Sequence, residues 1–306
     1  ETLLRTIMSG MIQMILGALV IVDFISLSRY LMHMTTMMRK RNLLIGFILA
    51  FLALGLEVTE AKSLENVIAG EHRSEQNKTR DIYRNPKETL EFFGIKSNMT
   101  VVEVWPSGGW YTEILAPYLN EKGQYISASF DFNSDSAFVQ RVGKIFLGKL
   151  EKRPDLYGNV KHGVLMLPDR VEVADPGSVD MVLTFRNIHN WMARGQEKIA
   201  IEAFYEMLKP GGILGVVEHR GDEVVPQDPA SKSGYVNQSY MIQIAEEAGF
   251  ILDASSEINA NPLDTKDHSE GVWTLAPTYR AQSDEQKKAL SEVGESDRFT
   301  LRFKKP

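Results

Sequence analysis

The sequence predicts an α/β protein with a doubly wound, mostly parallel sheet of seven strands and an N-terminal helical extension. From residue 100 onward, short apolar runs alternate with amphipathic helical patterns, as in a parallel sheet covered by helices on both faces. The middle runs are apolar throughout, which suits strands that are buried on both sides. Polar or small residues follow several runs directly, and ligands of such sheets bind beyond the carboxyl ends of the strands.

Composition narrows the classes of function. The chain has 306 residues, of which 43% are hydrophobic and 24% are charged, an ordinary globular composition. Its formal net charge of -6 argues against a nucleic-acid partner, because nucleic-acid backbones are bound by basic patches. Cysteine is absent from the sequence, which excludes a disulfide framework, a thiolate zinc site and a cysteine nucleophile.

Residues 38–61 have the pattern of a secretory signal peptide. The basic residues Arg39-Lys40-Arg41 precede an apolar run, Leu43–Leu56, and Thr59-Glu60-Ala61 supplies small residues for cleavage. This run is shorter than the roughly 20 residues of a membrane span. We therefore expect an exported, periplasmic protein whose mature chain begins near Lys62. The alternative is an uncleaved N-terminal anchor, which would be the protein's only membrane contact.

Residues 1–37 do not fit that pattern. An apolar stretch, Met11–Val22, is interrupted by Asp23 and later by Arg29. We interpret this range as an upstream extension that is not native to the protein. A first membrane helix is the alternative.

Residues 62–99 are polar and form the predicted helical extension. Pro86–Phe93 is typical of a helix with proline in its first turn, and Gly94 is a typical end for it. The preceding range, Arg80–Arg84, is a dense polar cluster. Such a cluster is usually a solvated helix face, and the alternative is a lid packed over the turn at Ser107.

Residues 100–306 form the main predicted domain. Strands are predicted at Thr100–Trp105, Gly123–Phe130, Val160–Leu167, Ser178–Phe185, Ile213–Glu218, Phe250–Ala254 and Phe299–Phe303. Helices are predicted at Tyr111–Leu119, Ser134–Leu150, Gln196–Leu208 and Gln238–Ala248. The last strand alternates apolar and charged residues, so we expect it at an edge of the sheet.

The first strand leads into a turn of small residues. The strand stops at Trp105-Pro106, Ser107-Gly108-Gly109 follows, and a helical pattern begins near Trp110. Such a turn lets backbone approach a ligand, and the helix behind it presents free N–H groups, although many glycine turns are simple loops. Glu103, the only charge in the strand, needs a polar partner, which a ligand's amine or hydroxyl would supply.

Together these segments resemble the class I S-adenosylmethionine-dependent methyltransferases, which have a Rossmann-like fold. More narrowly, they resemble a group of predicted bacterial methyltransferases with signal sequences. The matching segments are VVEVWPSGGWYTEILAPYL, SVDMVLTFRNIHNWM, LKPGG, SEINANPLDTKDH, GVWTLAPT and GESDRFTLRF. The resemblance implies S-adenosylmethionine as cofactor and methylation of a small-molecule acceptor.

The resemblance also implies where the cofactor is bound. Glu103 matches the acidic residue at the end of the family's first strand. Trp105, Ser107 and Gly109 match its three loop glycines, and Gly108 lies in the same loop. Because only Gly109 is glycine among the three, Trp105-Pro106 is a departure from the family pattern.

Three further residues complete the predicted site. Asp131 matches the second-strand acid that holds the ribose hydroxyls, with Ser129 as a competing register. Asn187 lies where the loop after the fourth strand meets the methyl donor. His189 is the candidate base, because imidazole titrates near neutral pH and an acceptor must lose any proton that it carries. A histidine bonded to a nearby backbone group is the alternative for His189.

The sequence predicts no metal site, because its acid–histidine clusters match no standard zinc or two-metal spacing. Two other functions stay open. One is an exported binding protein or a repurposed enzyme on the same fold that no longer uses S-adenosylmethionine, which is not expected outside the cytoplasm. The other is an enzyme that uses Asp267, His268 and His189 without a methyl donor. The sequence gives no prediction of oligomeric state.

Overall fold

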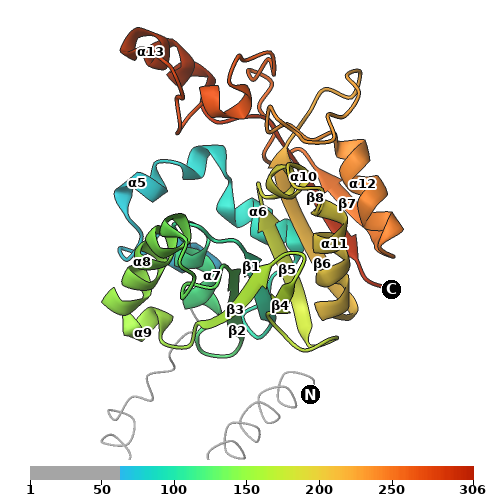
Figure 1. The fold of residues 1–306 in the computed structure, drawn as a ribbon. Helices are drawn as coiled ribbons and strands as arrows, with labels where there is room; N and C mark the ends of the chain where they lie inside the picture. The colour runs from blue at the N-terminus through green and yellow to red at the C-terminus, as the bar shows by residue number, and fades with distance from the viewer. Residues whose placement is uncertain (1–62) are drawn as a thin grey trace, which may run out of the picture. The chain divides into compact units, whose positions relative to one another are not determined.

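An eight-stranded sheet runs through the part of the chain that the computed structural model describes, residues 63–306 (Figure 1). The strands are β1 (Thr100–Val104), β2 (Gln124–Ser129), β3 (Lys161–Met166), β4 (Arg170–Glu172), β5 (Val179–Phe185), β6 (Leu208–His219), β7 (Ile251–Ser256) and β8 (Arg298–Lys304). The predicted signal peptide and the segment upstream of it lie outside the described residues. Within residues 63–306, no helix is both long and apolar enough to cross a membrane.

The order of the strands is β4-β3-β2-β1-β5-β6-β8-β7. Neighbouring strands from β3 across to β6 are parallel, whereas β4 is antiparallel to β3 and β8 is antiparallel to both of its neighbours. The predicted doubly wound, mostly parallel sheet is confirmed. All seven predicted strands are present, and β4 adds a short eighth strand that forms a hairpin with β3.

The last strand corrects one prediction, because β8 lies inside the sheet rather than at its edge. Its fully buried apolar side chains are Phe299, Leu301 and Phe303. Its two arginines pair with carboxylates: Arg298 with Glu295, and Arg302 with Asp253 of β7 at 2.6 Å. Alternating charge marks an edge only where the charges face water, and here carboxylates on neighbouring segments neutralise them.

Helices cover both faces of the sheet. One face packs against α10 (Ile188–Met192), α11 (Glu197–Met207) and α12 (Gln238–Glu247). The other packs against α4 (Leu64–Ile68), α6 (Pro86–Phe93), α7 (Thr112–Leu119) and α9 (Pro154–Tyr157). The central strand β1 serves both layers, because Val102 and Val104 belong to the first cluster and Val101 to the second.

The remaining elements lie in the extension, after β2 and in the C-terminal loops. They are α5 (Glu75–Lys78), η1 (Asp81–Tyr83), α8 (Ala137–Lys152), η2 (Gly271–Thr274) and α13 (Asp284–Val293). Figure 1 shows α5 and α13 above the same end of the sheet. The predicted helices do not include α13, although Ser283 and Gln286 form a capping box at its start.

Candidate functional site

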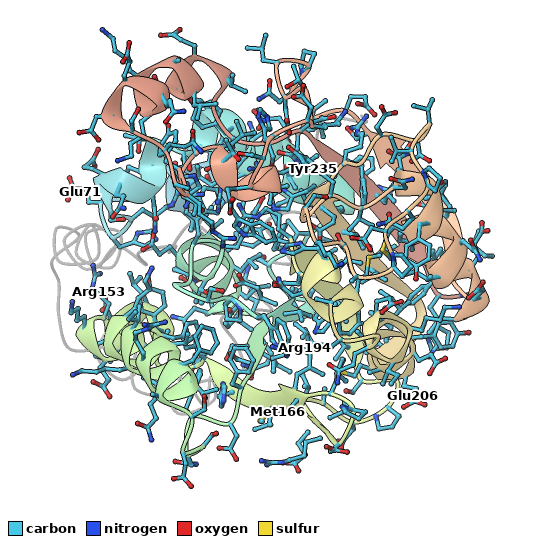
Figure 2. The ribbon with its side chains drawn as sticks, turned by 45° about the horizontal axis from the view of Figure 1, so that its top comes forward. Glu71, Arg153, Met166, Arg194, Glu206 and Tyr235 are labelled. Atoms are coloured by element: carbon cyan, nitrogen blue, oxygen red, sulfur yellow. The ribbon has the colours of Figure 1, made fainter. Side chains whose placement is uncertain are left out.

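A cavity of about 490 Å³ lies at the carboxyl ends of β1, β5 and β6. The β1–α7 loop, the start of α10 and His219 line its sheet side. Arg80 and Arg84 of the extension and the segment around Trp273 line it from the opposite side. Figure 2 turns this end of the molecule toward the viewer, with Arg194 just after α10 and Tyr235 near the C-terminal loops.

The structure brings five of the predicted site residues to this cavity. They are Glu103, Trp105, Ser107, Asn187 and His189. Gly108 and Gly109 belong to the same loop, and only Asp131 lies away from it. Arg80 and Arg84 of the extension line the same cavity as Ser107, where a lid was the alternative interpretation.

The β1–α7 loop has left-handed backbone at each of the three positions that match family glycines. The φ angles are +46° at Trp105, +51° at Ser107 and +73° at Gly109. Residues with a Cβ are strained in this region, and such strain is often stored at ligand sites. The loop therefore keeps the glycine-type backbone although two of its glycines are replaced.

The indole of Trp105 covers the carboxyl ends of β2 and β3. Its ring lies 5.0 Å from the rings of both Phe130 and Trp191. Its Nε1 donates a hydrogen bond to the carbonyl oxygen of Leu165 at 3.2 Å. Residues of β2 and β3 are not among those that line the cavity. The end of β2 is where the family resemblance places the ribose.

Asp131 already has a partner within the chain. Arg170 donates to its Oδ2 at 2.6 Å, and the backbone of Asn133 donates to its Oδ1 at 3.0 Å. The hydrogen bond from Arg170 lowers the pKa of this carboxyl. Its competing register, Ser129, is only 1% exposed. A ribose at Asp131 stays a prediction, and it would have to displace or join Arg170.

Glu103 is buried, and one of its oxygens is satisfied by the protein. Thr112 and Tyr125 both donate to Oε2, at 2.9 and 2.6 Å. Among the described residues, none donates to Oε1. Burial raises the pKa of Glu103 to about 7, against the opposing effect of these two hydrogen bonds and of Lys149. The protein itself therefore supplies polar partners for Oε2 of Glu103, and Oε1 is left for a ligand.

Asn187 joins the ends of two strands. Its Nδ2 donates to the carbonyl of Val104 at 2.9 Å and to Oγ1 of Thr184 at 3.2 Å. The residue is 6% exposed and lines the cavity. Its Oδ1 accepts no hydrogen bond from the described residues, so the carbonyl of this amide is available to a ligand.

His189 is oriented by a carboxylate rather than by a backbone group. Its Nδ1 lies 3.1 Å from Oε1 of Glu218, a residue that is fully buried. Because a carboxylate only accepts, Nδ1 of His189 carries the shared proton. Nε2 then remains free to take a proton, which is the arrangement used by general-base histidines.

Three potential metal ligands lie together here: atoms of His189, Glu218 and His219 are within 4.8 Å of one another. The carboxylate of Glu218 is already engaged, since it also accepts from the backbone N–H groups of Ile188 and His219. Burial lowers the pKa of His219 well below its usual value, and His189 and nearby arginines add to this effect. The surrounding positive charge opposes a divalent cation.

A cluster of arginines around Glu295 is the feature that sequence reasoning missed. Arg80 donates to its Oε1 at 2.6 Å and Arg84 to its Oε2 at 3.2 Å. Arg186 lies 3.6 Å from Oε2, and Arg298 donates to the same oxygen. Burial opposes the charged carboxylate, but the arginines hold the pKa of Glu295 well below its usual range. The available signal was the arginine directly after a buried strand, in RNIH.

The second polar cluster, around Asp264, lies outside the cavity. Asp264 accepts from His268 at 3.0 Å, from the hydroxyl of Tyr235 at 2.8 Å and from the backbone of Asp297 at 2.8 Å. These contacts bind loops to one another. Asp267 accepts from Thr265. Asp267 and His268 therefore do not line the cavity that His189 lines, and the described structure gives no support to an enzyme that combines the three.

Neither a protein-family model nor a curated protein sequence matches this chain. Solved structures do. A geranyl diphosphate C-methyltransferase from Streptomyces coelicolor, in complex with Mg²⁺, geranyl diphosphate and S-adenosyl-L-homocysteine, has a TM-score of 0.51 at 10% identity over 78% of this chain and 87% of that chain. The [4+2]-cyclase SpnF has a TM-score of 0.50 at 16% identity, over 79% and 92%. A SAM-dependent methyltransferase from Aquifex aeolicus has a TM-score of 0.49 at 16% identity, over 74% of this chain and 92% of that chain.

The fold is that of the class I methyltransferases. At these identities the likeness shows the fold and no more. The predicted Rossmann-like methyltransferase fold is thus confirmed, while the acceptor and the residues that bind the cofactor stay predictions.

Proposed function

We propose that this protein transfers the methyl group of S-adenosylmethionine to a small-molecule acceptor in the cavity above β1, β5 and β6. The observation that carries the proposal is that one cavity is lined both by residues of the β1–α7 loop, which has left-handed backbone, and by His189, whose imidazole is oriented by the carboxylate of Glu218. In this fold, ligands bind beyond the carboxyl ends of the strands.

The residues present fit one half of the cofactor. The loop backbone and Oε1 of Glu103 suit the amino-acid part. When bound, the cofactor supplies an electrophilic methyl group. The chain's own part is to align the acceptor beside that group and to take its proton, and our candidate for this base is Nε2 of His189, whose Nδ1 contacts Glu218.

A second candidate is ligand binding or another reaction on the same fold without S-adenosylmethionine. The position of Trp105 favours it, because the indole occupies the ends of β2 and β3 that the adenosine half would need. The likeness to SpnF, whose name is that of a [4+2]-cyclase, is compatible with this candidate.

Calorimetric titration of the full chain with S-adenosylmethionine and S-adenosylhomocysteine separates the two candidates. Binding that Glu103→Gln weakens, and that Glu91→Gln on the exposed side of α6 leaves unchanged, supports the methyltransferase. If neither compound binds the unmodified chain, the second candidate replaces it.

We also propose that the protein is exported. The support is the signal-peptide pattern of residues 38–61. Cell fractionation of a reporter fusion tests this location. A cytoplasmic reporter would contradict export and remove the main reason to doubt access to the methyl donor.

A further inference from the structure

We propose that the small molecule bound in this cavity carries a carboxylate or phosphate group, held between Arg84, Arg186 and Arg298. The inference deepens the proposed function, on which it rests for the role of this molecule as acceptor. The anion site itself applies equally to the second candidate.

The first argument is an excess of positive charge. Four guanidinium groups converge on one carboxylate, that of Glu295, which is 2% exposed. Glu103, the acid among the residues that line the cavity, is bonded to Thr112 and Tyr125 and pairs with none of these arginines. Four positive charges beside one negative charge attract a further anion.

The second argument is that buried donors are left unused. Arg84 is 4% exposed, and among the described residues only its Nε has a hydrogen-bond partner. Arg298 is 2% exposed, and its Nε is buried without a partner. Arg186 is less buried, with 23% of its side chain exposed, and among the described residues its one ion-pair contact is the 3.6 Å approach to Glu295. Unpaired buried donors are costly, so each is a place for a ligand oxygen.

The third argument is that the three side chains are held in place from separate elements. The guanidinium of Arg84 lies 4.7 Å from the ring of Trp110. Arg186 has a left-handed backbone with φ of +62°, fixed by its N–H bond to Val217. Arg298 donates from Nη1 to the carbonyl of Tyr83 at 3.0 Å.

Space for a ligand group exists beside these side chains. All three arginines line the 490 Å³ cavity, and a smaller void of about 10 Å³ lies between them. Planar guanidinium forks bind carboxylate and phosphate oxygens in pairs, and fixed forks lose little entropy when they do so.

The mutual effect of the arginines agrees with this geometry. Burial and then the neighbouring Arg298 lower the pKa of Arg186 to about 10, against the attraction of Glu295. Burial and then Arg186 likewise lower the pKa of Arg84. A bound oxyanion would relieve both the burial of charge and the repulsion.

The test is calorimetric titration of the full chain with inorganic phosphate, pyrophosphate and citrate at constant ionic strength, with chloride as the reference ion. Arg186→Gln removes one proposed donor without breaking a hydrogen bond within the described residues. Arg141→Gln, on the exposed side of α8, makes the same charge change away from the cavity.

We expect at least one of these anions to bind, and Arg186→Gln to weaken it by about tenfold or more, the size of a lost charge-assisted hydrogen bond. Arg84→Gln should act in the same direction, and Arg141→Gln should have no effect. Circular dichroism verifies that each variant is folded. The proposal is overturned if no anion binds better than chloride, or if the cavity variants and Arg141→Gln weaken binding equally.

Two nucleosides identify the molecule that carries the oxyanion. S-adenosylhomocysteine contains a carboxylate, whereas 5′-methylthioadenosine lacks the amino-acid part. If Arg186→Gln weakens the first and spares the second, the site holds the cofactor's own carboxylate. If Arg186→Gln leaves the binding of both nucleosides unchanged but weakens the binding of phosphate, the oxyanion belongs to the acceptor. If neither nucleoside binds while phosphate does, the methyltransferase proposal fails and the anion site stands.

Discussion

Nδ1 of His189 lies 3.1 Å from Oε1 of Glu218, and Oε2 of the same carboxylate accepts the backbone N–H of Ile188 at 2.6 Å. The contact joins the start of α10 to the end of β6. It fixes both the orientation of the imidazole and the nitrogen that carries its proton.

Glu218→Gln should therefore disturb the tautomer of His189. In the unmodified protein, long-range ¹H–¹⁵N NMR at pH 8 should show neutral His189 protonated on Nδ1. A glutamine cannot accept with both side-chain atoms, so we expect a mixture of tautomers and a loss of roughly 1–3 kcal/mol of stability. Ser296→Ala, which removes the partner of His219, is the control and should leave His189 unchanged. An unaltered His189 tautomer in Glu218→Gln would contradict the proposed orientation.

Glu103 should make stability depend on pH. Its pKa is about 7 in the folded protein and 4.5 as the ordinary value, so the folded state holds a proton that the unfolded state has lost between these pH values. Stability should fall as pH rises through this window, by roughly 3 kcal/mol in total.

Urea denaturation from pH 4.5 to 8 measures this effect. Glu103→Gln should lose that part of the pH dependence and be more stable than the unmodified chain at pH 8. Glu91→Gln, exposed on α6, should follow the unmodified chain. Parallel curves for Glu103→Gln and the unmodified chain would rule out a raised pKa.

Two neighbouring glycines should respond oppositely to alanine. A Cβ on Gly108 would meet no atom within 4 Å, so Gly108→Ala should stabilise the protein by about 0.4–1 kcal/mol. Gly109 has φ of +73°, and its Cβ would lie 3.3 Å from Thr112 and Lys149. Gly109→Ala should therefore destabilise by about 1–2 kcal/mol. Chemical denaturation of both variants checks the sign of each change, and equal effects would mean that the loop backbone differs from the one described.

Trp105→Gly should exchange stability for access to the ends of β2 and β3. The glycine relieves the left-handed strain but loses the packing on Phe130 and Trp191, for a net cost of about 2 kcal/mol. We expect tighter binding of S-adenosylhomocysteine by calorimetry. Phe138→Ala, which removes another ring beside Phe130, is the control and should leave affinity unchanged. Weaker binding in Trp105→Gly would show that the indole is part of the cofactor site.

Glu295→Gln should leave the four arginines without the one carboxylate that pairs with them among the described residues. Breaking a buried ion pair on one side costs roughly 3–5 kcal/mol. Phosphate should then raise the Tm of the variant more than that of the unmodified chain, because the anion binds only the folded state. Glu257→Gln removes the exposed partner of Arg220 and is the control. No added phosphate effect in Glu295→Gln would count against the anion site.

The sheet could be predicted from the sequence because its signals are local. Buried strands such as Val179–Phe185 are apolar along their whole length, and each is followed by a helical pattern. The same signals bring Glu103 and His189 to one end of the sheet. The neighbour of a strand is not a local property, so the interior position of β8 was missed.

Much of the site could not be predicted either, because its contacts join residues that are far apart in the sequence. Arg84, Arg186 and Arg298 are distant in sequence, and the fold brings all three to Glu295 and to the same cavity. Asp131 was predicted from its place after β2, but its pairing with Arg170 depends on the hairpin of β3 and β4. Side chains that act together across separate elements leave no spacing pattern to read.

The interior position of β8 also sets the order in which the molecule can assemble. β7 is synthesised before β8, yet its only partner in the sheet is β8. During vectorial synthesis β7 therefore waits unpaired until residues 298–304 emerge from the ribosome. Glu295 and Arg298 arrive with that same segment, so the arginine cluster forms as the sheet closes. A nascent chain halted before residue 295 would lack Glu295 and Arg298 of the anion site together with the strand that joins β7 to the sheet.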